Sequence, residues 1–158
     1  QSLLTILGVQ FFCATQRAAW TRALQPDHHS AAPPPASTWL YRFDHSTNAS
    51  DPWLGVGHSD EIPFVFADKS ARLTRETASL SDAIIRYWTR FAAHADPNHA
   101  SSSSAGNPLW PAVSATSGEL DGLVLNTTLR VEPVLEASHC RAVMQALELK
   151  HFPHAGGS

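Results

Sequence analysis

The chain has 158 residues, of which 43% are hydrophobic and 16% are charged, and it contains five tryptophans. This composition predicts a buried core and argues against a disordered or low-complexity protein. The formal net charge of -3 offers no basic footprint, so we expect no binding to nucleic acid or to an anionic membrane through bulk electrostatics.

Two apolar segments open the chain. Leu3 to Ala14 is shorter than the roughly 20 apolar residues that cross a bilayer, and it has no basic leading region of a signal peptide, so we expect a buried segment. Thr15 to Leu24 predicts a short helix that packs beside it, because Ala19 and Ala23 lie at helical spacing. Gln25-Pro26 would end that helix.

A proline-rich loop and a strand follow. Residues 27–37 are polar and contain three consecutive prolines, which predicts an exposed loop. The loop includes His28 and His29, but adjacent histidines without a third ligand do not predict a metal site, and we expect neither a metal nor an organic cofactor. Trp39 to Phe43 is aromatic and alternating, as a strand should be, and Asp44-His45 closes it.

The clearest predicted helix is Ser79 to Ala93, with Ser79 or Ser81 as the N-terminal cap and Asp96-Pro97-Asn98 as the end. We interpret its aromatic side chains as core residues rather than as a ligand-binding set. Four residues at helical spacing form its apolar stripe: Leu80, Ile84, Trp88 and Phe91.

The last third of the chain predicts two further elements. Residues 99–108 are rich in serine and predict a surface loop. Leu123 to Leu125 predicts a short edge strand after a turn at Asp121-Gly122. A final helix is expected from near Pro133 to Leu147, and residues 151–158 are expected to form a flexible tail.

One histidine has a distinctive context. His58 follows the glycine-rich Leu54-Gly55-Val56-Gly57 and precedes the apolar run Ile62 to Phe66. Glycines permit a tight loop, the apolar run can anchor that loop in the core, and an imidazole titrates near neutrality. The segment therefore predicts a histidine on a tight loop that is anchored in the core.

This segment resembles the one that carries the catalytic histidine in type B carboxylesterases and cholinesterases. Phe43-Asp44-His45 resembles a second stretch of that family, and Tyr87 to Ala92 with Asp96-Pro97-Asn98 and Trp110-Pro111 resembles a third. The resemblance implies an α/β fold, specifically the C-terminal portion of an α/β-hydrolase fold with terminal sheet strands and flanking helices. Residues 1–150 would form this part, which is incomplete as an independent domain.

The resemblance implies that His58 is the general base and acid of a serine carboxylic-ester hydrolase. In α/β-hydrolases the nucleophile comes first in the chain, the acidic residue second and the histidine last. These residues contain no Gly-x-Ser-x-Gly. We therefore expect the nucleophile and the acidic residue on a missing N-terminal part, which would be the partner of this chain, with a small ester as the substrate.

The residues around His58 agree with the family pattern except at one position. Gly57 and Glu61 match it, and Glu61 resembles an acidic residue near the active site. Ser59 stands where the family commonly has glycine, and its Cβ would be strained if the backbone needs a positive φ. Asp60 would favour the protonated, non-basic imidazole if its carboxylate pointed inward.

The resemblance also implies a disulfide between Cys13 and Cys140, and hence an oxidising compartment. Sequons at Asn48 and Asn126 predict glycosylation and agree with secretion or the endoplasmic reticulum lumen. Related cholinesterases use the late helix in dimer contacts, so a homodimer or larger assembly is a plausible expectation.

An alternative stays open: a noncatalytic cholinesterase-like module for adhesion, scaffolding or assembly. The family includes noncatalytic members, the neuroligins and a domain of thyroglobulin among them. Ser59 and the lack of a nucleophile in these residues favour this alternative, whereas the intact His58 favours the esterase. An upstream Gly-x-Ser-x-Gly would discriminate the two.

Overall fold

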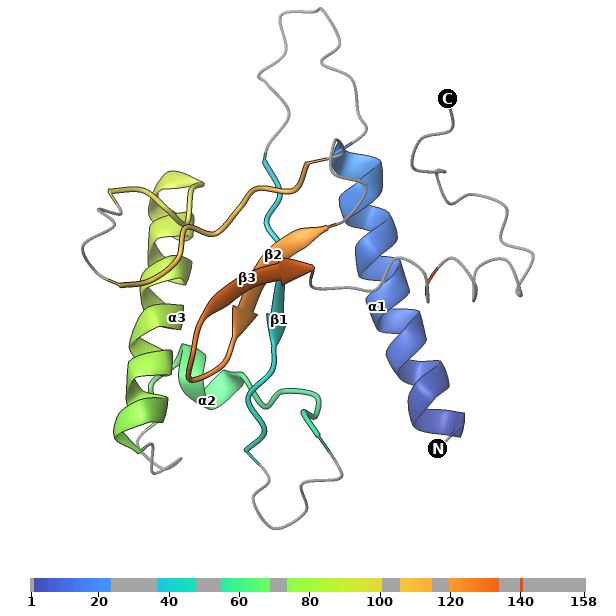
Figure 1. Cartoon of the computed structure of the whole chain (residues 1–158), viewed down its shortest axis with the longest axis horizontal. Coiled ribbons are helices and arrows are strands. Elements are labelled where there is room, and N and C mark those ends of the chain that lie inside the picture. The colour runs from blue at the N-terminus through green and yellow to red at the C-terminus, as the bar shows by residue number, and fades with distance from the viewer. Residues whose placement is uncertain are drawn as a thin grey trace, which may run out of the picture. The chain divides into compact units, whose positions relative to one another are not determined.

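Figure 1 shows the computed structural model of the chain. The structure describes residues 2–23, 37–47, 55–68, 74–100, 106–114, 120–133 and 140. The described elements are α1 (Ser2–Ala23), β1 (Tyr41–Phe43), α2 (Ile62–Val65), α3 (Arg75–His94), β2 (Asp121–Leu125) and β3 (Arg130–Pro133). Among the described helices, none combines the length and the apolar character that a membrane span requires.

The chain forms two compact units. The first, here the disulfide unit, comprises Gln1–Leu40, Ala112–Gly122 and Pro133–Ser158. The second, here the sheet unit, comprises Tyr41–Pro111 and Leu123–Glu132. Asn48, most of the predicted loop at 27–37 and the tail at 151–158 lie outside the described residues, as do residues 101–105 of the loop at 99–108.

The disulfide unit contains α1, which is one helix of 22 residues where the sequence predicted two packed segments. No glycine or proline interrupts the chain between the two segments, so the helix continues through them. The Thr15 hydroxyl donates to the Phe11 carbonyl at 2.9 Å, and its hydrogen-bonding need is therefore met within the helix. The expectation of a wholly buried first segment is wrong at Phe11 and Phe12, which are 74% and 51% exposed. Cys13, on another face, is buried.

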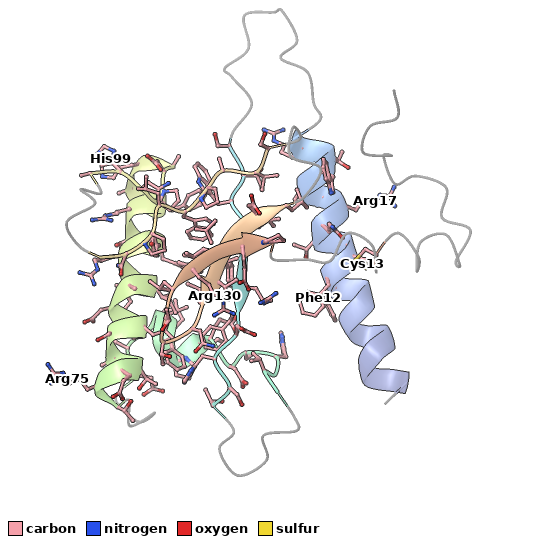
Figure 2. The ribbon with its side chains drawn as sticks, viewed as in Figure 1. Phe12, Cys13, Arg17, Arg75, His99 and Arg130 are labelled. Carbon is pink, nitrogen blue, oxygen red and sulfur yellow. A yellow bond between two sulfur atoms is a disulfide. The ribbon has the colours of Figure 1, made fainter. Side chains whose placement is uncertain are left out.

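Cys13 is joined to Cys140 by a disulfide across 127 sequence positions, as predicted (Figure 2). Cys140 is helical, and it is the one residue after Pro133 in the predicted late helix that the structure describes. Pro133 does not start that helix, because it is the last residue of β3. Proline is tolerated there because β3 is an edge strand of the described sheet, where a nitrogen without a hydrogen need not donate to a ladder.

The same unit holds the start of the predicted strand at 39–43. Trp39 forms an isolated antiparallel bridge with Ala112, and the Val113 amide donates to the Thr38 carbonyl at 2.7 Å. The regular ladder begins only at Tyr41, in the sheet unit.

The sheet has the order β1-β2-β3. β1 pairs with β2 in parallel, with Tyr41 opposite Leu123 and Phe43 opposite Leu125, and Figure 1 shows β3 running in the opposite direction beside β2. β2 is therefore the middle strand of the described sheet, and the prediction of an edge strand is wrong. Complete burial of Leu123, Val124 and Leu125 gives the reason, because a strand covered on both faces carries a continuous apolar run.

α3 begins at Arg75, four residues before the predicted start. Its cap is Thr74, whose hydroxyl accepts a hydrogen bond from the Thr77 amide at 3.3 Å. Ser79 and Ser81 are not caps: their hydroxyls donate to the carbonyls of Arg75 and Phe64. A serine inside a helix can satisfy its hydroxyl in this way, so the presence of serine did not mark the helix start.

The buried stripe of α3 also differs from the prediction. It contains Leu80, Ala83, Ile84 and Tyr87, whereas Phe91 is 48% exposed. Steps of three and four residues lead from Leu80 to Ile84 and then to Tyr87, which keeps the tyrosine on the buried side. The Tyr87 hydroxyl donates to the Pro108 carbonyl at 2.5 Å, so its polar end is satisfied.

The aromatic side chains of this region pack on one another, as the core interpretation predicted. The Trp88 and Trp110 rings lie 5.5 Å apart between centroids, and the Tyr41 ring meets the edge of Trp88 at 5.0 Å. The side chain of Asn98 donates to and accepts from the backbone of Trp110 at 2.8 Å each, which fixes this segment beside α3.

Candidate functional site

His58 lies in a tight turn that leads directly into α2. The Gly57 amide donates to the Asp60 carboxylate at 2.8 Å, and the Ile62 amide donates to the Ser59 carbonyl at 3.1 Å. Asp60 is thus turned toward the backbone of the loop. Its carboxylate acts as a local brace of the turn that carries the histidine.

Ser59 has a φ of 72°, in the left-handed region that favours glycine. A residue with a Cβ pays about 1 to 2 kcal/mol for this conformation. The turn therefore places serine at a positive φ that glycine would adopt without strain. Strain of this kind persists only where surrounding contacts enforce it, and it gathers at functional sites.

The His58 side chain is exposed. Within the described ranges, no hydrogen bond or ion pair engages its imidazole. An imidazole so placed can exchange protons with groups brought to it from outside these residues.

α2 anchors the turn through a single buried side chain. Phe64 is 2% exposed, while Ile62 and Phe66 are 46% and 76% exposed, so the prediction that the apolar run anchors the loop holds at Phe64 alone. The Ser81 hydroxyl of α3 donates to the Phe64 carbonyl at 2.6 Å. The Phe43 ring of β1 lies 5.2 Å from the Phe64 ring.

Glu61 occupies the N-terminal cap position of α2, but its side chain makes no capping hydrogen bond. Its backbone carbonyl accepts from the amides of Phe64 and Val65. Burial, and then the negative charge of Glu61, raise the pKa of Tyr41. Glu61 is thus electrostatically coupled to β1.

Sequence reasoning missed a polar clamp beside this site. The Asn126 side-chain amide donates to the Asp44 carbonyl at 2.7 Å, and its carbonyl oxygen accepts from the Thr127 amide at 2.7 Å. The same oxygen lies 3.4 Å from Nδ1 of His45, whose ring meets Phe64 edge-on at 5.4 Å. The signal that could have revealed the clamp is the position of Asn126 directly after the buried strand β2.

A second missed feature is a closed set of four alternating charges on the sheet. Arg42 pairs with Glu132 at 2.9 Å and with Asp44 at 3.7 Å, and Arg130 pairs with both acids at 2.9 Å. Hydrogen bonds to these acids raise the pKa of Arg130, and the bond from Arg130 lowers the pKa of Glu132. The pairs connect β1 to β3 across β2, which no local sequence signal reveals.

A metal site would need several ligating side chains close together within the described residues. In that part of the chain, no cluster of three or more His, Cys, Asp or Glu side chains could hold a metal ion. His28 and His29 lie outside it.

Comparison with known proteins places these features in context. Residues 9–143 match the profile of the carboxylesterase family. The chain is 42% identical over 78 residues to an acetylcholinesterase from Gallus gallus, covering 46% of this chain and 10% of that protein. It is 35% identical over 99 residues to a pyrethroid hydrolase from Rattus norvegicus, covering 58% and 16%. An acylcarnitine hydrolase from Rattus norvegicus is 34% identical over 97 residues, covering 56% and 16%. The aligned part thus spans between a tenth and a sixth of the length of these relatives.

Proposed function

The chain belongs to the carboxylesterase family, whose fold is that of the α/β-hydrolases, and we propose from this premise that it is the histidine-bearing part of a serine carboxylic-ester hydrolase. His58 is the general base and acid of the reaction. The nucleophilic serine and the acidic residue come from a part of the hydrolase outside these residues. The observation that carries the proposal is the placement of an exposed imidazole on a braced, strained turn inside the matched region.

The proposed chemistry is a two-step acyl transfer. The serine oxygen attacks the ester carbonyl while His58 takes the serine proton, and the resulting imidazolium returns that proton to the departing alkoxide. Water then repeats the sequence on the acyl-enzyme, and the serine is regenerated. The turn around Ser59 and Asp60 supports this role because it holds the ring without occupying its nitrogens.

The relatives support an ester as the substrate class. Their names denote hydrolysis of acetylcholine, pyrethroids and acylcarnitines. Acetylcholine and acylcarnitines are carboxylic esters of amino alcohols, so an ester is the bond that this chain would help to break. We expect a small ester, without choosing an alcohol or acyl group.

The disulfide supports a location in the secretory pathway. Cys13 and Cys140 are joined, and such bonds persist in oxidising compartments. We propose that the protein is secreted or resides in the endoplasmic reticulum lumen. Non-reducing peptide mapping of the protein from its native source would detect the bond, and a free thiol at either cysteine would contradict the proposal.

The test is hydrolysis of a short-chain nitrophenyl ester by the complete protein and by a His58→Ala variant. Removal of the general base should lower kcat by three orders of magnitude or more, because the serine then has no proton acceptor. His99→Ala is the matched control, since His99 is also exposed but lies in the segment after α3. Equal activity of the wild type and His58→Ala would overturn the assignment of His58.

The second candidate is a noncatalytic adhesion, scaffold or assembly module, as a homodimer or larger complex. The serine at position 59 and the lack of a Gly-x-Ser-x-Gly in these residues favour it. No hydrolysis by the wild type, together with a stable complex by sedimentation, would favour this candidate. Hydrolysis of the ester by a Ser59→Gly variant would instead favour the esterase candidate.

A further inference from the structure

We propose that Asn126 and His45 are positioning residues that hold the His58 turn through Phe64. The proposal rests on the proposed function of His58 and deepens it. Neither residue touches a reacting atom in this scheme. Each acts on the geometry of the turn by a chain of contacts that begins at the ends of β1 and β2.

The first link is the clamp of Asn126. Its Nδ2 donates to the Asp44 carbonyl at 2.7 Å, and the Asp44 amide donates to the Leu125 carbonyl at 2.9 Å. The residue that follows β1 is therefore bonded on both sides to the segment that ends β2. Asn126 is half-buried, so these bonds are partly shielded from competing water.

The second link is His45. Its Nδ1 lies 3.4 Å from Oδ1 of Asn126, which orients the ring in its plane. The ring then meets Phe64 edge-on, with centroids 5.4 Å apart and an interplanar angle of 76°. Edge-to-face contacts of this kind are directional, because the positive edge of one ring faces the negative face of the other.

The third link is the short distance in sequence from Phe64 to His58. Phe64 lies in the single helical turn of α2, and its amide donates to the Glu61 carbonyl at 3.0 Å. The Ile62 amide is bonded to Ser59. A displacement of Phe64 is therefore carried into the His58 turn through consecutive hydrogen bonds.

The clamp gives the Asn126 side-chain nitrogen a structural use in the folded protein. That atom is also the one that a glycan would modify in the sequon Asn126-Thr127-Thr128. The two roles can be separated by mutation, because Thr128 is required for the sequon and is exposed. Thr128→Ala removes the sequon and leaves the Asn126 side chain intact.

The experiment compares ester hydrolysis by five forms of the complete protein: wild type, Asn126→Asp, His45→Ala, His45→Phe and Thr128→Ala. Asn126→Asp removes the donor to Asp44, and His45→Ala removes the ring. Both should lower kcat by about tenfold with KM nearly unchanged, since misplacement of a catalytic group by a fraction of an ångström acts on the chemical step. His45→Phe keeps the ring and should recover most of kcat.

Thr128→Ala should keep the wild-type kcat. A fall in kcat for Thr128→Ala equal to that for Asn126→Asp would assign the effect to a glycan and overturn the proposal. Unchanged kcat in His45→Ala and Asn126→Asp would overturn it too, while a large loss in His58→Ala in the same assay would leave the proposed function standing. Assays are run at a temperature where thermal unfolding shows each variant to be folded, and a loss that His45→Phe fails to recover would contradict action through the ring.

Discussion

The interactions within the disulfide unit differ in kind from those within the sheet unit. In the disulfide unit a covalent bond joins Cys13 to a residue 127 positions away. In the sheet unit, side chains from β1, α3 and the segment after β2 converge without a covalent link on Phe64 and Asp44. The candidate catalytic histidine belongs to the second arrangement, in which a small change in one contact can shift the site without unfolding the chain.

The comparison teaches where sensitivity should lie. Loss of the disulfide should change stability and leave the chemistry of the folded state unaltered. Loss of the contacts on Phe64 should change both, because they connect the core to the His58 turn. Four substitutions test this difference, beginning with the largest expected effect.

Replacement of both cysteines should produce the largest loss. A chain-entropy estimate for a loop of this length gives roughly 4 to 5 kcal/mol of the free energy of unfolding. Denaturant unfolding of Cys13→Ala/Cys140→Ala would measure it, and kcat of the folded variant should equal that of the wild type. A reductant should lower the free energy of unfolding of the wild type and leave that of the variant unchanged. An equal decrease in both proteins would contradict the prediction.

Phe64→Ala should lower the free energy of unfolding by about 3 to 4 kcal/mol, because it removes a buried aromatic side chain and leaves a cavity. In contrast to the cysteine variant, its folded fraction should also hydrolyse the ester more slowly. Phe64→Leu is the matched control, since it refills much of the volume and should restore stability more completely than kcat. Wild-type kcat in Phe64→Ala would refute the link between this side chain and the turn.

Ser59→Gly should stabilise the sheet unit by about 0.5 to 1 kcal/mol. Glycine adopts the φ of 72° without the Cβ penalty, although it also has more freedom in the unfolded chain, which offsets part of the gain. The midpoint of thermal unfolding would show the increase. Glycine at an exposed position with ordinary backbone, such as Ser79 in α3, should do the reverse, and a lower midpoint in Ser59→Gly would show that the strain has been overestimated.

Removal of one charge from the four-charge set, by Glu132→Gln, should have the smallest effect on stability, and this effect should depend on pH. The hydrogen bond from Arg130 lowers the pKa of Glu132 from its ordinary value of 4.5. The stabilisation is therefore fully present above pH 4.5 and is lost as the pH falls through the lower, folded-state pKa. The difference in stability between wild type and Glu132→Gln should shrink in that acid range and at high salt, because the pairs are partly open to solvent. A difference independent of pH would contradict the pairing.

Several features of the site were predictable from local sequence. Gly57 and His58 before an apolar run predicted a tight, anchored turn, and Ser59 has the positive φ under which its Cβ was expected to be strained. The apolar run Leu123 to Leu125 predicted a strand, although its place in the middle of the described sheet was missed. The start of α3 was missed because Thr74 and Ser79 are equally good caps on composition alone.

The sequence by itself determined the family, the joined cysteines and the turn around His58, because these depend on motifs or on residues close together in the chain. Only the tertiary structure showed that Asn126 bonds to Asp44, that His45 rests on Phe64, and that Arg42 and Arg130 share two acids. Asn126 and Asp44 are 82 positions apart in the sequence, Arg130 and Asp44 are 86 apart, and Arg42 and Glu132 are 90 apart. Contacts at such distances follow from the parallel pairing of β1 with β2, and a pattern of neighbouring residues carries no record of them.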